Sequence, residues 1–372
     1  MAVYTTIDDP SEYFHIQTWT GTADDSTKVI TNDANAGNFK PDWLWIKSRS
    51  GNYEDRDHAL YDSSRGQTKR LESSATDTEA TDSNNTFNTN GFTLTANYSI
   101  NGPSTTYVGW QWKCNGGTTT SHSSGSNGAE VASVYQVNDT AGFSIGTYTG
   151  AGGNNVAVYT GLSAACEAVI VKNRDATTDW AVGFSEKIST AAARYFSLNN
   201  TDQAQSVGPN SGERQQGAIN VNNFGAGLFD ITTGGAGDND VFQDGEKYVF
   251  YAFRSIQGYS KFGKYKGNGN TDGAFVYTGF KPAWLMVKKI EDNNRSWVIH
   301  DNKQDPHNVT ANRLDADKTQ AQQSSGHFDF LSNGFKCRST EGATNQNSNT
   351  FVYLAFAEHP FVSSKGTPTT AR

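Results

Sequence analysis

The stretch "GAFVYTGFKPAWLMVKK", at Gly273–Lys289, repeats in altered form a phrase near the other end of the chain, "GNFKPDWLWIKSR" at Gly37–Arg49. Both phrases begin an apolar run after a Lys-Pro pair and end it on lysine. Proline has no amide hydrogen, so it is tolerated at the first residue or the edge of a strand. The apolar run is typical of a buried strand, and the closing lysine is expected to return the chain to solvent. The recurrence predicts internal repeats of one strand-based unit.

Three cassettes of this kind follow one another, each about a hundred residues long, which is the size of an ordinary domain. An aromatic residue stands two positions before a glycine at the start of each cassette: Trp19, Tyr148 and Tyr265. The apolar run that ends in lysine comes next: "WLWIK" to Lys47, "AVIVK" to Lys172 and "WLMVK" to Lys288. An alternating strand closes each cassette: "YVGWQWK" at Tyr107–Lys113, "YVFYAFR" at Tyr248–Arg254 and "FVYLAFA" at Phe351–Ala357. The cassettes are therefore expected to share one fold.

The closing strands present one apolar face, because side chains alternate between the two faces of a strand. That face carries Val108, Trp110 and Trp112 in the first cassette, Val249, Tyr251 and Phe253 in the second, and Val352, Leu354 and Phe356 in the third. We expect it to pack on a second sheet of its own unit, with Trp43 or Trp45 and with Trp284 also buried. Together with many Gly, Asn and Ser turns, this predicts an all-β fold of three tandem, related β-sandwich or jelly-roll units.

The unit boundaries follow from composition. A first unit is expected at residues 1–115, a second at 131–256 and a third at 257–372, which ends in a short polar tail. Residues 116–130 are rich in Gly and Ser and are predicted to be a flexible linker. The junction at Ser255–Gly267 is shorter and carries aromatic residues, so the second and third units are expected to pack more closely.

Charge and composition exclude several classes of function. The formal net charge of −8 argues against nucleic acid as a partner, because neutralising phosphates needs a basic face. No apolar run is long enough for a membrane span, and the N-terminal residues lack the pattern of a secretory signal, so folding in a cytoplasm is expected. Cys114, Cys166 and Cys337 are far apart and odd in number, which favours buried free thiols.

The sequence lacks the residue spacings of the common cofactor-binding and catalytic motifs. The glycine runs at 150–153 and 267–273 lack the spacing of phosphate or dinucleotide loops and are interpreted as turns. No nucleophile elbow is present, and the histidines, among them His15, His58, His122 and His300, show no zinc-binding spacing. We therefore expect no enzyme activity, no cofactor and no metal ion.

Two acidic segments carry carboxylates that catalysis or calcium binding could use. The first holds Glu54, Asp55, Asp57 and Asp62; a sandwich glycosidase needs two carboxylates in one cleft, but the segment has the composition of a solvated turn. The second holds Asp238, Asp240, Asp244 and Glu246; these could bind calcium, but their spacing is not that of an EF-hand loop. Trp19, Tyr148 and Tyr265 could stack on sugar rings, but their repeated position favours core packing. Glycan-binding residues therefore stay unassigned.

Several phrases together resemble one protein family: "KPDWLWIKSRSG" at 40–51, "LYDSSRG" at 60–66, "NGFTL" at 90–94, "AGFSIGTYTG" at 141–150, "SNGFKCRST" at 332–340 and "VYLAFAEHPFVSSKG" at 352–366. They are similar to a repeat-built family of virion proteins from phages of marine bacteria, which resembles concanavalin-A-like lectin domains. The resemblance covers essentially the whole chain and is poorest in the middle cassette. It supplies no motif from which catalytic residues could be transferred.

The resemblance implies a structural protein of the phage particle, assembled in the host cytoplasm. The first expectation is a tail-associated fibre or receptor-binding component that contacts bacterial surface glycans without catalysis. The alternatives are a capsid-decorating or head-fibre protein and, with least support, a glycan-degrading enzyme. Expected partners are other virion proteins and further copies of this chain, because single sandwich units bind glycans weakly.

Overall fold

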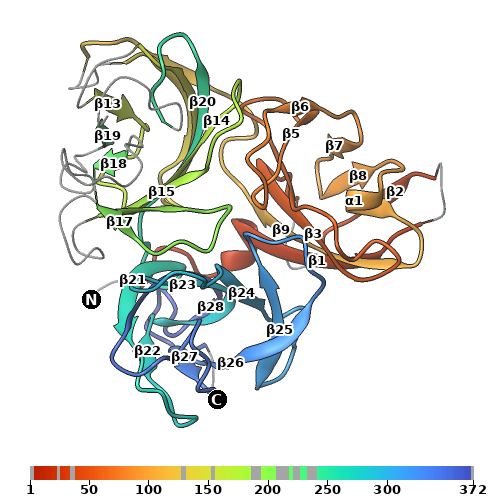
Figure 1. Cartoon of the computed structure of the whole chain (residues 1–372), viewed down its shortest axis with the longest axis vertical. Coiled ribbons are helices and arrows are strands. Elements are labelled where there is room, and N and C mark those ends of the chain that lie inside the picture. The colour runs from red at the N-terminus through yellow and green to blue at the C-terminus, as the bar shows by residue number, and fades with distance from the viewer. Residues whose placement is uncertain are drawn as a thin grey trace.

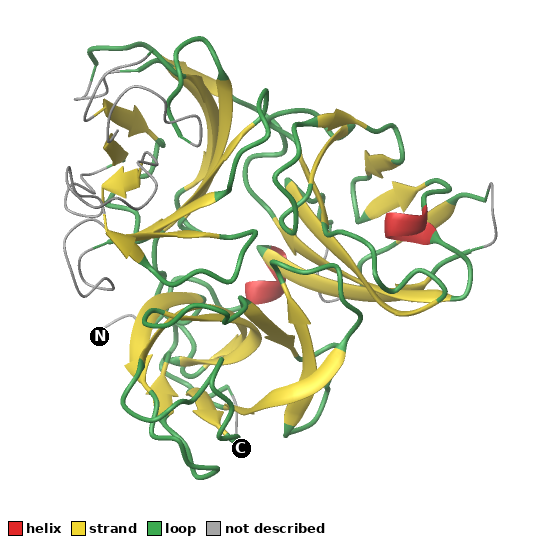
Figure 2. Cartoon of the chain, viewed as in Figure 1, coloured by secondary structure: helices red, strands yellow, loops and turns green. Residues whose placement is uncertain are grey.

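A computed structural model describes residues 4–22, 26–33, 38–126, 131–151, 156–185, 194–206, 218–220, 227–232 and 241–369. Across these residues the fold is all-β, as Figure 2 shows, and the sheets are antiparallel. The helical turns within the described ranges are η1 (Pro10–Glu12) and α1 (Tyr98–Asn101). No helix in that part of the chain has the length and apolar character needed to cross a membrane.

Unit 1 is formed by two sheets. The larger has the order β1-β9-β3-β4-β5-β6 and the smaller β2-β8-β7. Their bounds are β1 (Phe14–Thr20), β2 (Lys28–Ile30), β3 (Trp43–Gly51), β4 (Ala59–Asp62), β5 (Lys69–Leu71), β6 (Ala80–Thr81), β7 (Asn85–Phe87), β8 (Phe92–Leu94) and β9 (Thr105–Trp112).

Unit 2 has a larger sheet in the order β10-β11-β12-β20-β14-β15-β16-β17 and a smaller one in the order β13-β19-β18. Their bounds are β10 (Thr120–His122), β11 (Ser133–Asn138), β12 (Phe143–Thr149), β13 (Val156–Tyr159), β14 (Ala168–Asn173), β15 (Ala181–Phe184), β16 (Arg194–Ser197), β17 (Gln205–Ser206), β18 (Ala218–Asn220), β19 (Leu228–Thr232) and β20 (Lys247–Phe253).

Unit 3 is one eight-stranded sheet in the order β21-β28-β23-β24-β25-β26-β27-β22, curled so that it is nearly closed. Its bounds are β21 (Ser260–Lys266), β22 (Phe275–Tyr277), β23 (Phe280–Lys289), β24 (Val298–Asp301), β25 (Thr310–Asp315), β26 (Gln323–Leu331), β27 (Gly334–Cys337) and β28 (Thr350–Pro360). The three units lie around a common centre (Figure 1).

The repeated phrases occupy equivalent strands. The order β1-β9-β3-β4-β5 of unit 1 corresponds to β12-β20-β14-β15-β16 in unit 2 and to β21-β28-β23-β24-β25 in unit 3. The aromatic residue at the start of each cassette stacks on a ring of the closing strand. The ring centroids lie 5.6 Å apart for Trp19 and Tyr107, 5.0 Å for Tyr148 and Tyr248, and 5.1 Å for Tyr265 and Phe351. All six rings are buried, so the core-packing interpretation of these positions is confirmed.

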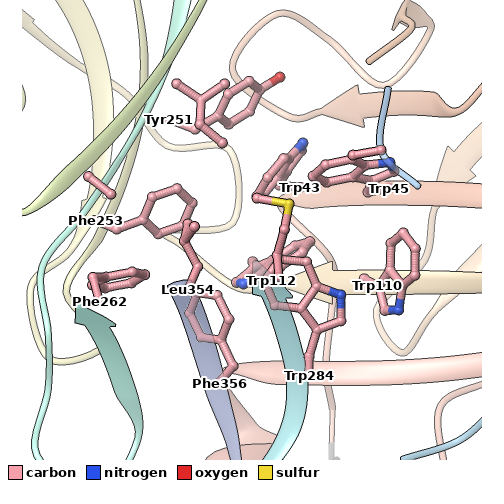
Figure 3. Close-up of a cluster of buried hydrophobic side chains, with 14 of the residues drawn as sticks. Trp43, Trp45, Trp110, Trp112, Tyr251, Phe253, Phe262, Trp284, Leu354 and Phe356 are labelled. Atoms are coloured by element: carbon pink, nitrogen blue, oxygen red, sulfur yellow. The ribbon is translucent and has the colours of Figure 1, made fainter. Parts of the chain in front are cut away.

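The apolar face of the closing strands does not pack as the sequence suggested. Trp110 and Trp112 of β9, Tyr251 and Phe253 of β20, and Leu354 and Phe356 of β28 meet in one cluster shared by all three units (Figure 3). The opposite face of these strands packs inside each unit, with Tyr107, Tyr248 and Phe351 in three separate cores. The expectation of a second sheet of the same unit over the apolar face is therefore wrong. Both faces are buried, as in the strands of doubly covered sheets.

Tryptophan rings form the middle of the shared core. The Trp43 ring lies 4.2 Å from that of Trp112 and 4.5 Å from that of Tyr251, which belongs to unit 2. The Trp112 ring lies 5.8 Å from that of Trp284 of unit 3, edge to face. Burial of these rings was predicted correctly, but they join units rather than fill one of them.

A second repeated device ties each unit to the next. The residue before strands β4, β15 and β24 has a ring nitrogen that bonds to a backbone carbonyl of the neighbour. The pairs are His58 Nε2 with Asp315 O at 2.9 Å, Trp180 Nε1 with Glu72 O at 2.8 Å, and Trp297 Nε1 with Ser197 O at 2.9 Å. Unit 1 thus contacts unit 3, unit 3 contacts unit 2, and unit 2 contacts unit 1. The contacts form a closed ring.

The lysines that end the repeated strands are buried, so the expectation that they return the chain to solvent is wrong. Lys47, Lys172 and Lys288 are fully buried. Lys47 Nζ donates to Thr319 O of unit 3 at 2.9 Å, and Lys288 Nζ donates to Asn200 O of unit 2 at 3.4 Å. Burial lowers the pKa of Lys47 to about 7 and that of Lys288 to about 8, because an ammonium loses hydration there.

The segments between units are ordered where they are described. Thr120–His122 forms β10 at the edge of the unit 2 sheet, although this segment was predicted to be a flexible linker. Gly116 N donates to Asp42 Oδ2 of unit 1 at 2.9 Å, which fixes the start of the same segment. The polar tail is also held, because Ser364 donates from its backbone and hydroxyl to Asp8. Both junctions contribute to the shared core, through Cys114 at the first and Ile256 at the second.

Substituting Trp43 with alanine is expected to destabilise the whole protein. The cavity left in the shared core should cost about 3–5 kcal/mol of unfolding free energy. Because the ring touches unit 2, all units should lose stability together in one transition, monitored by urea denaturation followed by tryptophan fluorescence and circular dichroism. Val29→Ala is the control, since Val29 is 61% exposed. Three separate transitions, or an unchanged midpoint, would contradict the shared core.

The pH dependence of stability tests the buried lysines. The pKa of Lys47 falls from 10.5 to about 7 on folding, so between those values the unfolded chain binds more protons and stability must rise with pH. Up to about 1.4 kcal/mol per pH unit is available from one such site. We expect the urea midpoint to increase from pH 7 to pH 9 and Lys47→Met to flatten this increase. An identical slope in wild type and variant would show that Lys47 does not titrate in this range.

Candidate functional site

A groove on unit 3 carries the most exposed tyrosine rings of the described chain. It encloses about 420 Å³, within the range of small-ligand sites. Tyr277 of the edge strand β22 and Tyr4 of the N-terminal segment are 60% and 50% exposed and both line it. The remaining lining residues are Ser255, Gln257, Ser260, Lys261, Thr278, Gly279, Phe361 and Val362. Strands β21 and β22 lie in unit 3, next to the N-terminal end of the chain (Figure 1).

Local contacts hold the backbone that carries both rings. Thr5 Oγ1 donates to Gln257 O at 2.8 Å, so the segment that carries Tyr4 is held against the turn before β21. Gly258 in that turn has φ +80°, and a Cβ there would meet Thr5 Oγ1 at 2.6 Å. Tyr277 follows Val276, which is buried and pairs with Phe335 of β27. The rings therefore stand on ordered backbone.

Tyr277 has an equivalent in unit 2 whose ring is covered by another side chain. Val276 pairs with Phe335 as Val158 pairs with Phe229 in unit 2, so Tyr277 and Tyr159 occupy equivalent positions. The Tyr159 ring is covered by the imidazole of His122, which stacks on it at 4.1 Å. His122 belongs to β10, and the unit 3 sheet has no equivalent strand among the described residues. The ring face that unit 2 covers internally is left open in unit 3.

Four polar groups face solvent around these rings. They are the phenol oxygens of Tyr4 and Tyr277, the amide of Gln257 and the ammonium of Lys261. Within the described ranges none of these side chains takes part in an internal hydrogen bond or ion pair. The other polar side chains of the groove bond internally; Thr278 Oγ1, for example, donates to Phe280 O at 2.7 Å. Open ring faces beside free hydroxyl, amide and ammonium groups can bind a polyhydroxylated ring by stacking and hydrogen bonding.

A second cavity lies between units 1 and 3 and has a different character. It encloses about 390 Å³ over a floor of Phe14, Ile16, Ala283 and Ala357. Four carboxylates line it, Asp8, Asp9, Asp33 and Glu358, and the other polar residues are Ser11, His15, Asn302, Lys303 and His359. Asp33 is 3.3 Å from Lys303 Nζ and 3.9 Å from His15 Nε2. Burial lowers the pKa of His15, so the imidazole is neutral near pH 7.

The acidic segments considered from sequence are not brought together. Glu54, Asp55 and Asp57 lie in the turn between β3 and β4, whereas Asp62 is buried and pairs with Arg65 at 2.5 Å. Asp238 and Asp240 lie outside the described residues. Asp244 is in a turn, and Glu246 accepts a hydrogen bond from Asn173.

The other residues considered as metal ligands, reactive thiols or cofactor loops form no site among the described residues. In the described part of the chain no three His, Cys, Asp or Glu side chains are grouped to hold a metal ion. Cys114, Cys166 and Cys337 are buried free thiols, as expected, and burial raises the pKa of each. The loop at 267–273 is held by Asn345, whose amide donates to Asn268 Oδ1 and Asn270 O.

Sequence reasoning missed Tyr4, Tyr277 and Lys261. A signal existed for Tyr277, because it follows an exposed phenylalanine at alternating spacing on a short strand. Phe275 and Tyr277 point away from the core that Val276 joins. Two aromatic residues on the solvent face of an edge strand are unusual in a soluble protein unless they contact something.

Tyrosine nitration tests whether the Tyr277 ring is open. Tyr277 and Tyr4 are expected to react first with tetranitromethane, as mapped by mass spectrometry, because they are the most exposed tyrosines described. Tyr159 should be protected in the wild type and should react in His122→Ala, which removes the covering ring. Protection of Tyr277 equal to that of Tyr159 in the wild type would contradict the comparison between units.

The comparisons with known proteins agree with the extent of the fold. A family described as "Domain of unknown function (DUF7483)" matches residues 9–360, a range that includes strands of all three units. Neither the curated proteins nor the solved structures gave a match. The chain therefore belongs to the DUF7483 family.

Proposed function

We propose that this protein is a non-catalytic glycan-binding component on the exterior of a phage particle, associated with the tail. The observation that carries the binding activity is the open Tyr277 ring, whose equivalent in unit 2 is covered by His122. Sugar rings present flat apolar faces surrounded by hydroxyls, and exposed tyrosines beside free amide and hydroxyl groups complement both features. The phage assignment rests on the sequence phrases that resemble virion proteins.

The units are proposed to be related β-sandwiches of the lectin-like, jelly-roll type. In unit 1 the small sheet covers the large one, since Ile30 and Phe92 of the small sheet share a core with Leu44 of the large sheet. Such a scaffold places loops and edge strands at the periphery and keeps them fixed. Binding by this protein would thus depend on residues presented by rigid strands.

Binding without catalysis is supported by the lining of the groove. Glycoside hydrolysis needs a pair of carboxylates, one as acid and one as base or nucleophile. The groove lining contains no Asp or Glu. Tight binding to the glycan would need many copies of the protein on one particle, because the linked sites of a homo-oligomer bind a polymer with higher avidity than one site does.

The test uses surface polysaccharide from the host bacterium and the intact protein. Wild type should bind it, measured by biolayer interferometry, and Tyr277→Ala should weaken binding about tenfold, which corresponds to about 1.4 kcal/mol. Val134→Ala is the matched control, because Val134 is an exposed strand residue of unit 2. Melting temperatures should be the same for all three proteins.

Two outcomes would contradict the proposal. A fall in the molar mass of the polysaccharide during incubation, followed by light scattering, would show an enzyme. Normal adsorption by virions that lack the protein, with no binding of the protein to cells, would favour capsid decoration. Antibody labelling of purified particles then decides between tail and head.

A further inference from the structure

We propose that the ligand of the unit 3 groove is an anionic glycan, and that Lys261 binds its carboxylate or sulfate group. This inference rests on the proposed glycan-binding function and specifies its substrate class. Lys261 is the single charged side chain among the residues that line the groove. It stands beside the two exposed tyrosine rings, so one sugar unit can stack on a ring and place an acidic substituent near the ammonium.

Lys261 differs from three other lysines of unit 3, each of which has a carboxylate partner. Lys281 pairs with Glu358 at 2.6 Å, Lys303 with Asp33 at 3.3 Å, and Lys336 with Asp272 at 2.5 Å. Lys261 has no such carboxylate partner in the described part of the chain. An unpaired ammonium in a groove that contains no acid is available to a ligand anion without first breaking an internal ion pair.

The charge of the rest of the molecule makes this site selective. The formal net charge is −8, and the cavity between units 1 and 3 is lined by Asp8, Asp9, Asp33 and Glu358. An anionic polymer is repelled by the carboxylates of that cavity and disfavoured by the net negative charge of the chain. The groove of unit 3 combines ring faces with an unopposed positive charge, which directs an anionic chain to this location.

The small positive charge of the groove favours a glycan over a nucleic acid. Bases also stack on aromatic rings, but single-strand binding proteins follow the phosphate backbone with a positively charged groove. One lysine in a chain of net charge −8 does not provide such a path. A polymer with acidic groups spaced along neutral, hydroxylated rings fits the groove, because it needs one cation for each bound sugar unit.

The experiment compares three polymers of defined charge on the intact protein: polygalacturonate, dextran sulfate and neutral dextran. Wild type should bind one or both polyanions more tightly than dextran, with an affinity that falls as salt rises. Lys261→Gln should lower polyanion affinity about two- to fivefold at low salt and flatten the salt dependence. Which polyanion binds distinguishes a carboxylate from a sulfate ligand.

Lys266→Gln is the matched control, because Lys266 is exposed on the same strand, outside the groove, and changes the net charge equally. Equal losses in the Lys261 and Lys266 variants would overturn the inference, since the effect would then be general charge. If Tyr277→Ala abolishes binding and Lys261→Gln does not change it, the inference is wrong and the proposed function stands. If wild type binds neither these polymers nor the host polysaccharide, the proposed function itself is wrong.

Discussion

The closing strands β9, β20 and β28 are buried on both faces, and the rest of the structure depends on that constraint. One face completes the core of its own unit, and the other meets its counterparts at the common centre. Neither face can be exposed without leaving large aromatic rings in water. The units are therefore parts of one folding body, and the surface left for recognition consists of peripheral loops and sheet edges.

Repetition and strand positions could be predicted from sequence, but the arrangement of the units could not. The alternation of Trp110 and Trp112 looks the same whether the partner is a sheet of the same unit or a neighbouring unit. The lysines mislead for a similar reason. Lys47 Nζ donates to the nearby carbonyls of Ser48 and Glu54 and also to Thr319 O, which is 272 residues away. A local pattern carries no information about that last contact.

The candidate site shows the same limit. Tyr159 and Tyr277 are equivalent tyrosines on equivalent strands, and their neighbours in sequence do not separate them. What separates them is His122, which comes from a strand present in one unit and absent from the other within the described residues. The binding surface thus arises from a missing structural element, and it becomes visible only when the units are compared in three dimensions.

The closed ring of contacts has a consequence for how the protein is made. Unit 1 bonds to unit 3 through His58 and Asp315. Unit 1 is synthesised before unit 3, so it cannot make this contact until unit 3 has been made. Until β23 and β28 are made, Trp110 and Trp112 of β9 lack Trp284 and Phe356, the unit 3 rings that contact them. The nascent chain therefore exposes the aromatic face of β3 and β9 until unit 3 is made. The yield of folded protein in a cell is then expected to depend on chaperones and on the rate of elongation.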